Sequence, residues 1–293
     1  MRGSATLRWS ATIAAVAVAT GLLCLGAWAA APAADTLSKD APQGAEQLQD
    51  TPAKAAPPKG APKKGKGLAM TPAFEDDFTG DWTKKQKAWR VATWKQNGAQ
   101  MSPKRCATDG KTHMVQTVLA GAPYRGGSMQ TAGEYPYGRW LARLKPSPVP
   151  GVLNSMFTMD WDNLKTPDKE GDGSHFEVDI EFLTYTFGPG RGKVHLAVHV
   201  PGKSNAFVED VPLDFNPSDG FRNWGFDILP DKIVWHVDGK VIRSWKRPEQ
   251  YKFHPNYEFF FNSWTKPKWI KGPPEKDAKY HIDWVRFYPV AEK

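Results

Sequence analysis

Between residues 70 and 293, apolar and polar residues repeatedly alternate one by one, which is the period of an extended strand. The clearest run is Lys193–Val200, while Lys232–Val237 and Lys240–Trp245 flank Asp238 and Gly239, a typical two-residue hairpin turn. No segment keeps a 3.6-residue period for three turns. Further strands are expected at His113–Leu119, Arg139–Lys145, Val152–Asp160, Trp224–Leu229, Tyr257–Ser263 and Tyr280–Tyr288. About ten strands with Gly- and Pro-rich turns predict an all-β, antiparallel sandwich or barrel.

The start of the chain has a different composition from this body. Arg2 and Arg8 precede an apolar run over residues 11–31, which is rich in small residues and ends near two Ala-x-Ala sites. This pattern predicts a signal peptide over residues 1–34, cleaved near residues 29–34, and therefore a secreted or periplasmic protein. An uncleaved membrane anchor is the alternative, because about 20 apolar residues span a bilayer.

Residues 35–69 are expected to form a disordered linker rich in Pro, Ala and Lys, because residues 50–67 include no large apolar side chain. The lysines of this linker give a second hypothesis, a weak contact with an anionic surface such as lipid headgroups or an acidic polysaccharide. The chain has two cysteines, Cys24 and Cys106, so a disulfide framework and a cysteine-type zinc site are excluded. Cleavage near residues 29–34 would remove Cys24 and leave Cys106 as the remaining cysteine. Lipidation of Cys24 is a further alternative.

The formal net charge of +8 first suggests a nucleic-acid ligand. Residues 1–69 hold 8 Lys/Arg and 4 Asp/Glu, and the remaining residues hold 31 and 27, so half of the excess lies on a quarter of the chain. The body therefore has a mixed surface with little bias. We expect no nucleic-acid partner and a monomeric protein.

Three acidic residues share one face of the segment His175–Leu183. Glu177, Asp179 and Glu181 alternate with the apolar residues Val178, Ile180 and Phe182. Acidic residues are poor strand formers, and like charges on one face repel each other. A strand that carries them opposes its own stability, which is typical of a functional site.

Such a set suits glycoside hydrolysis, which needs two carboxyl groups at the scissile bond, about 5–5.5 Å apart in a retaining enzyme. Positions i and i+4 of a strand lie roughly 13 Å apart at Cα, a gap that two glutamate side chains can mostly close. The shorter Asp179 would then lie below the reaction plane, and its charge would help to keep a proton on a neighbouring glutamate. A solvated strand face and a hard-cation site remain open as alternatives.

Aromatic residues give a second indication. Eleven of the 13 tryptophans lie in the body, where an indole either fills the core or offers a stacking surface to a sugar ring. Trp264 and Trp269 belong to the polar, Pro-containing stretch Phe261–Gly272, which is expected to form a rim loop. Asn262 in the same stretch would offer a sugar hydroxyl both a donor and an acceptor.

The segment Glu177–Leu183 resembles the catalytic signature of the family 16 glycoside hydrolases. Other segments resemble the family in the same order along the chain: Phe74–Phe78, Tyr137–Lys145, Pro150–Val152, Phe221–Asp227, Ile233–Gly239, Asn262–Trp264 and Ile282–Arg286. Together they cover nearly the whole body. The resemblance implies a β-jelly-roll sandwich of the concanavalin-A-like type, with a glycan-binding groove on its concave face.

The resemblance also implies retaining hydrolysis of a β-linked polysaccharide by double displacement. We expect neither a cofactor nor a bound metal. Glu177 would be the nucleophile, Glu181 the general acid/base, and Asp179 the helper that positions and tunes them. The candidate sugar-binding residues are Asn97, Phe157, Met159, His199, Asn262, Trp264 and Trp269. For His199, an ordinary strand histidine is the alternative.

One residue separates Asp179 from Glu181 in this signature. Family members that cleave laminarin-like or agar-like chains tend to carry one more residue, which forms a bulge. The form without it resembles the lichenases, the succinoglycan-type glycanases and the xyloglucan transglycosylases. The chain departs from the lichenase pattern at Ser128, Gln130, Ala197 and His199.

The expected activity is therefore that of an endo-β-glycanase acting on β-1,3-1,4-glucan or a related exopolysaccharide. The alternatives are a transglycosylase that uses the same site and a non-catalytic glycan-binding module.

Overall fold

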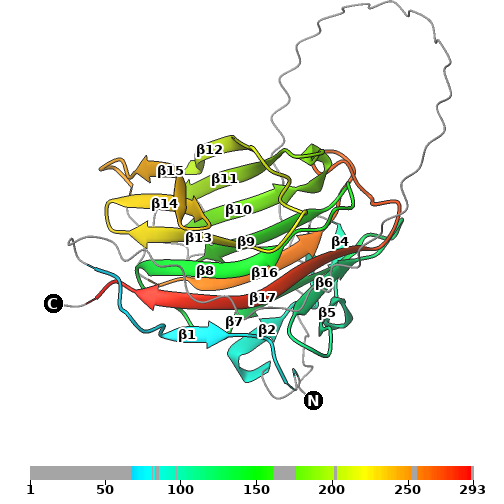
Figure 1. The fold of residues 1–293 in the computed structure, drawn as a ribbon, viewed down its shortest axis with the longest axis horizontal. Helices are drawn as coiled ribbons and strands as arrows, with labels where there is room; N and C mark the ends of the chain where they lie inside the picture. The colour runs from blue at the N-terminus through cyan, green and yellow to red at the C-terminus, as the bar shows by residue number, and fades with distance from the viewer. Residues whose placement is uncertain are drawn as a thin grey trace, which may run out of the picture. The chain divides into compact units, whose positions relative to one another are not determined.

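The alternating segments pair into two β-sheets in the computed structural model, which describes residues 67–80, 82, 86–96, 98–160, 176–200, 203–251 and 256–291 (Figure 1). All of these belong to one compact unit of the chain, residues 56–293. The predicted signal peptide and the predicted linker up to residue 66 lie outside the described residues. Within the described part of the chain, no helix combines the length and the hydropathy that a membrane span requires.

The first sheet contains eight strands: β1 (Phe74–Asp76), β5 (Cys106–Thr108), β6 (Met114–Val118), β8 (Gly138–Lys145), β13 (Arg222–Leu229), β14 (Lys232–Val237), β15 (Lys240–Lys246) and β17 (Ala278–Pro289). Their spatial order is β15-β14-β13-β8-β17-β6-β5, and β1 pairs with β17. All pairs within this sheet are antiparallel.

The second sheet contains nine strands: β2 (Trp89–Val91), β3 (Lys95–Gln96), β4 (Ala99–Met101), β7 (Arg125–Thr131), β9 (Leu153–Met159), β10 (Glu177–Leu183), β11 (Gly192–Val200), β12 (Lys203–Leu213) and β16 (Glu258–Trp264). Their order is β12-β11-β10-β9-β16-β7-β4-β3, and β2 pairs with β7. The short contact between β4 and β7 is parallel. Three single 3-10 turns accompany the strands within the described residues: η1 (Gln86–Ala88), η2 (Pro103–Arg105) and η3 (Thr184–Thr186).

This architecture confirms the prediction of an all-β, antiparallel sandwich. The strand predicted at Lys232–Val237 is β14 itself, and the others agree with the observed strands to within about two residues. The number of strands is larger than predicted, because the short strands β1 to β5 and the strands β7 and β12 show no clear alternation in the sequence.

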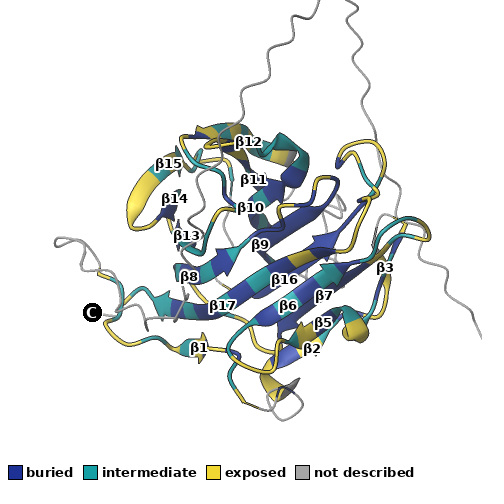
Figure 2. Cartoon of the chain, turned by 45° about the vertical axis from the view of Figure 1, so that its right-hand side comes forward, coloured by how far each residue is buried: buried dark blue, intermediate teal, exposed yellow. Residues whose placement is uncertain are grey.

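The core lies between the two sheets. Val178, Ile180 and Phe182 of β10 are fully buried there, and Trp140 of β8 stacks on Phe259 of β16 with ring centres 4.1 Å apart. Figure 2 shows the central strands dark blue, while exposed residues gather at the edge, as on β15. Because successive side chains point to opposite faces of a strand, the acidic residues of β10 project from the face that looks away from this core.

Candidate active site

Three rows of side chains cross the outer face of β10, because β10 lies between β9 and β11 (Figure 1). The register places Glu177 between Met159 and His199, Asp179 between Phe157 and Ala197, and Glu181 between Ser155 and His195. The pairing with β9 runs through all seven residues of β10 without a shift, so the expectation of a signature without a bulge is confirmed.

A hydrogen bond through the core fixes the backbone of β10. Trp235 of β14 is fully buried, and its Nε1 donates to the carbonyl oxygen of Asp179 at 3.0 Å. A tryptophan from the opposite sheet thus holds the central residue of the acidic set in place, and the strand can carry three acids on its other face.

The three carboxyl groups are close enough to perturb one another. Burial, followed by the charge of Glu177, raises the pKa of Glu181 to about 8. Burial, the charges of Glu177 and Glu181, and a hydrogen bond with Glu177 raise the pKa of Asp179 well above its usual value. With this pKa, Glu181 holds a proton at neutral pH, and the hydrogen bond with Glu177 favours the protonated form of Asp179. Glu177 is then the carboxylate available as a nucleophile, and Glu181 is the neutral acid that can protonate a leaving group.

His199 lies beside Glu177 because the two residues pair directly across β10 and β11. The pairing of β11 with β12 on the other side shifts register between Val198 and Val200, next to His199. The backbone N–H of Asn205 donates to Nδ1 of His199 at 3.0 Å, so the neutral ring carries its proton on Nε2. Nε2 lies 3.6 Å from Oδ2 of Asp179.

This tautomer decides whether a metal ion fits here. Glu177, Asp179 and His199 each place one potential ligand atom within 4.8 Å of the others. A histidine ligand needs a free lone pair on the coordinating nitrogen, whereas Nε2 of His199 carries the proton. The site is therefore better suited to a substrate than to a metal ion.

A second histidine faces Glu181, and the sequence analysis missed it. Nε2 of His195 lies 3.8 Å from Oε2 of Glu181, and Nδ1 lies 2.6 Å from Oδ1 of Asp210 on β12. The carboxylate of Asp210 orients the ring, as a carboxylate partner does for many functional histidines. Asp210 is 15 residues away from His195, and only the cross-strand pairing of these two residues reveals the contact.

The predicted residues of the neighbouring strands lie on the same face as the acids. Phe157 stacks on Phe260 of β16 with ring centres 4.6 Å apart, and Met159 is partly buried next to Glu177. The hydroxyl of Ser155 donates to Oδ1 of Asn262 at 2.5 Å. A polar row thus runs from Glu181 through Ser155 to Asn262.

The prediction that both tryptophans lie in a rim loop is wrong for Trp264. It is the last residue of β16 and is 3% exposed, because its ring packs into a small second cluster with Leu153, Leu183 and Ile270. Trp269 does lie in the following loop and is 37% exposed. Its ring centre lies 5.9 Å from that of His195, which brings it to the Glu181 end of the acidic row.

Of the remaining candidates, Asn97 lies outside the described residues. Ser128 and Gln130 of β7 pair with Asn262 and Phe260, so the positions that depart from the lichenase pattern are on the same face as the acids. Gln130 donates to Glu258 at 3.0 Å. An Arg90–Glu258 ion pair completes this polar cluster.

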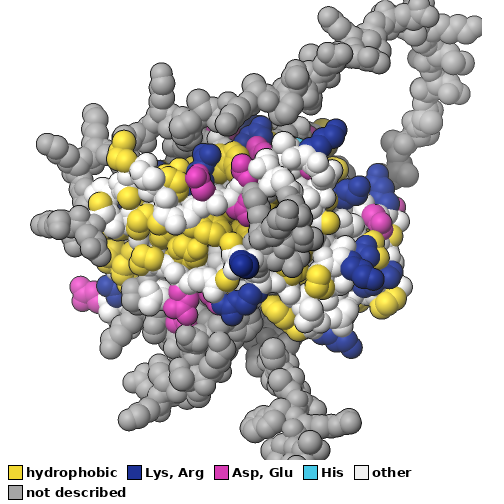
Figure 3. Space-filling model, turned by 90° about the horizontal axis from the view of Figure 1, so that it is seen from below, with side chains coloured by type: hydrophobic (Ala, Val, Ile, Leu, Met, Phe, Trp, Pro, Cys, Tyr) yellow, Lys and Arg dark blue, Asp and Glu magenta, His cyan; other side chains and the backbone are white. Residues whose placement is uncertain are grey.

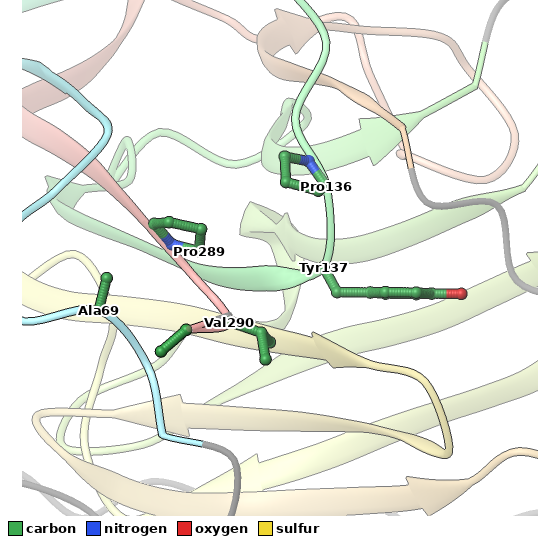
Figure 4. Close-up of a pocket in the computed structure, with 6 residues that line it drawn as sticks. Ala69, Pro136, Tyr137, Pro289 and Val290 are labelled. Carbon is green, nitrogen blue, oxygen red and sulfur yellow. The ribbon is translucent and has the colours of Figure 1, made fainter. Parts of the chain in front are cut away.

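A shallow depression elsewhere is lined by Ala69, Pro136, Tyr137, Pro289, Val290 and Ala291, at the ends of β8 and β17 in the other sheet (Figure 4). It contains no carboxylate and so offers no comparable chemistry. Figure 3 shows one face of the molecule, on which acidic side chains lie among basic ones. The expected glycan groove over the acids stays a prediction.

Comparison with known proteins bears on the chemistry of this site. The family model for glycosyl hydrolases family 16 matches residues 75–286. A β-glucanase of Bacillus subtilis (strain 168) is 27% identical over 199 residues, which cover 67% of this chain and 74% of the relative. The endo-1,3-1,4-β-glycanase ExoK of Rhizobium meliloti (strain 1021) is 27% identical over 233 residues, which cover 75% and 80% of the two chains.

Solved structures support the same fold. The β-glucanase of Bacillus licheniformis superposes with a TM-score of 0.62 at 21% identity, covering 75% of this chain and 99% of that one. The laminarinase catalytic domain of Thermotoga maritima gives a TM-score of 0.62 at 17% identity, with coverages of 76% and 99%. At these identities the structural likeness concerns the fold alone.

Proposed function

Because this chain belongs to glycosyl hydrolases family 16, we propose that it is a retaining endo-β-glycanase that cleaves β-1,3-1,4-glucan or a related exopolysaccharide. The chain is a β-glycan hydrolase of the endo-β-glucanase type, and its relatives from Bacillus and Rhizobium carry the names of such enzymes. The observation that carries the mechanism is the placement of Glu177 and Glu181 on one face of β10, where burial and the charge of Glu177 raise the pKa of Glu181 to about 8. A non-catalytic binding module would not need a carboxyl group whose pKa is raised in this way.

In the first step, the carboxylate of Glu177 attacks the anomeric carbon of the sugar. Glu181 gives its proton to the glycosidic oxygen, which leaves with the second part of the polysaccharide. The first part remains bound to Glu177 as an ester. The hydrogen bond between Asp179 and Glu177 orients the nucleophile before the attack.

In the second step, Glu181 is ionised and takes a proton from a water molecule. This water attacks the anomeric carbon and breaks its bond to Glu177, so the product regains the original configuration. His195 faces Glu181 in both steps, and Asp210 holds the ring of His195. We assign His195 and Asp210 as positioning residues, because His195 acts on Glu181 and Asp210 acts on His195.

We further propose that the enzyme is exported from the cytoplasm. We also propose that it is a monomer and that it has no nucleic-acid partner. Support for export comes from the basic start, the apolar run and the Ala-x-Ala sites of residues 1–34. Sequencing the amino terminus of the protein recovered outside the cytoplasm tests the cleavage near residues 29–34. An intact Met1 in that fraction would favour the uncleaved membrane anchor.

Incubation with a panel of polysaccharides tests the activity: lichenan, barley β-glucan, xyloglucan, laminarin and succinoglycan. We expect new reducing ends and a rapid fall in chain length with lichenan, barley β-glucan or succinoglycan, as an endo-acting enzyme produces. Products longer than an added oligosaccharide would instead identify a transglycosylase. Absence of cleavage and of transfer on the whole panel would contradict the proposal.

Single substitutions then test the two roles. Glu177→Ala and Glu181→Ala are expected to lower kcat by at least about a thousandfold while the proteins remain folded. The exposed Glu249→Ala variant serves as the matched control and keeps the activity of the natural protein. Full activity in both active-site variants would overturn the assignment.

A further inference from the structure

A lysine lies at the Glu181 end of the acidic row, in the loop that follows β16. Nζ of Lys266 lies 5.4 Å from the ring centre of Trp264 and 5.5 Å from that of Trp269. The backbone N–H of Gly272 donates to the carbonyl oxygen of Lys266 at 3.0 Å and closes this loop. Two indoles and a closed loop therefore hold the ammonium group in one region, close enough to Glu181 to act on its pKa.

The charge of this lysine is not neutralised within the described part of the chain. No ion pair there involves Lys266, or the exposed Lys268 and Lys271 of the same loop. Lys271 instead lies over the ring of Tyr185 at 4.2 Å. Glu181 is close to Lys266 but holds a proton at neutral pH. One cation, Lys266, thus lies near Glu181, and two further exposed lysines belong to the same loop.

The charge of Lys266 also opposes the role of Glu181 as a general acid. Its positive charge lowers the pKa of Glu181, whereas a general acid must keep its proton at neutral pH. Asp210, the other charge near Glu181, is already hydrogen-bonded to His195 at 2.6 Å. The position of Lys266 is therefore not explained by the acid that it flanks, but a negative charge on the substrate would explain it.

We propose that Trp269 and Lys266, supported from behind by the buried Trp264, form one wall of the site and bind a sugar unit that carries a carboxylate, so that the substrate is an acidic β-glycan. This inference rests on the proposed glycanase function and names its substrate class. The exposed face of Trp269 supports the sugar ring, and the ammonium group of Lys266 donates a charge-assisted hydrogen bond to the carboxylate. The loop lysines Lys268 and Lys271 add to the local positive potential.

Binding without turnover gives the most direct test. The full-length Glu181→Gln variant keeps residue 181 uncharged, as in the protonated enzyme, and stops hydrolysis. The probes are oligosaccharides of barley β-glucan and the same oligosaccharides with their C6 hydroxymethyl groups oxidised to carboxylates. We expect about tenfold tighter binding of the oxidised probe in calorimetric titration, and a smaller difference at high salt.

Two further substitutions in this background locate the effect. Lys266→Met keeps the apolar stem over the indoles but removes the charge, and is expected to abolish most of the preference for the oxidised probe. Lys279→Met, an exposed lysine on β17 in the other sheet, should leave the preference unchanged. This pair separates the wall from the general attraction of a chain with a net charge of +8.

Equal affinity for the two probes, or a preference that survives Lys266→Met, would overturn the acidic substrate class. Hydrolysis of neutral β-glucan by the natural protein would then still support the proposed function. Lack of binding to either probe would contradict the acidic substrate class, whereas the proposed function is decided separately by cleavage in the polysaccharide panel.

Discussion

The proton on Glu181 predicts how activity depends on pH. With a pKa of about 8, roughly nine-tenths of the molecules carry this proton at pH 7, whereas a glutamate with the ordinary value of 4.5 would carry it in about one molecule in 300. In the free enzyme, kcat/KM follows the protonated fraction on its alkaline side. We expect kcat/KM to fall about tenfold between pH 7 and pH 9, with a midpoint near 8.

Two substitutions should move this midpoint in opposite directions. The charge of Asp210 raises the pKa of Glu181 and that of Lys266 lowers it, so Asp210→Asn shifts the alkaline limb down and Lys266→Met shifts it up. Both shifts should be modest, because Asp210 is about half exposed and solvent screens its charge. Asp231→Asn, in an exposed turn of the other sheet, is the control.

The assay is the initial rate on a low concentration of soluble β-glucan, followed by reducing ends, with tryptophan fluorescence as a check of folding at each pH. A rate that stays constant up to pH 10, or that has already fallen below pH 6, would refute the assignment of the proton to Glu181. Shifts of the same sign in the Asp210 and Lys266 variants would refute the electrostatic reasoning.

Three further predictions concern residues around the site and in the scaffold. Trp235→Phe removes the hydrogen bond to the Asp179 carbonyl and should lower the free energy of unfolding by about 1 kcal/mol in urea titrations, together with a lower kcat; an unchanged kcat would mean that this bond does not position β10. Trp269→Ala should raise KM about threefold to tenfold with little loss of stability, because its ring is 37% exposed, and an unchanged KM would exclude it from the sugar-binding wall. Asp227→Asn should lower the free energy of unfolding by about 2 kcal/mol at pH 7, because Arg139 and His236 lose their buried partner. Although burial raises the pKa of Asp227, these partners hold it below its usual value, so the stability is present above the unfolded pKa and is lost as the pH falls through the folded pKa. The difference between Asp227→Asn and the natural protein should therefore shrink at strongly acidic pH, and an equal difference at both pH values would contradict this.

Part of the site could be predicted from the sequence, because it depends only on the alternation of side chains between the two faces of a strand. The outer face of β10 follows from the alternation of its acids with Val178, Ile180 and Phe182. The strands β11 and β14 show the same alternation, and they were predicted to within one residue. In these segments one face is buried and the other is polar, so the sequence carries a clear signal.

The rest depends on contacts between strands that are far apart in the sequence. The strand β7 is buried on both faces except at its first residue and contains Gly126 and Gly127, so it shows no alternation. His195, Asp210 and Lys266 come next to Glu181 only through the order of β10, β11, β12 and the loop after β16. Trp264 lies in a polar stretch of sequence, but in the structure it is the last residue of β16. Its ring is buried because Ile270, from the following loop, packs in the same cluster.

Chemical rescue tests the division of labour between the two glutamates most directly. Glu177→Ala and Glu181→Ala are each given an aryl β-glycoside of a glucan oligosaccharide in the presence of azide. If Glu177 is the nucleophile, azide restores turnover of Glu177→Ala and yields the α-glycosyl azide, whereas Glu181→Ala yields the β-glycosyl azide through its intact ester. An α-azide from Glu181→Ala, with no rescue of Glu177→Ala, would reverse the two roles and contradict the mechanism.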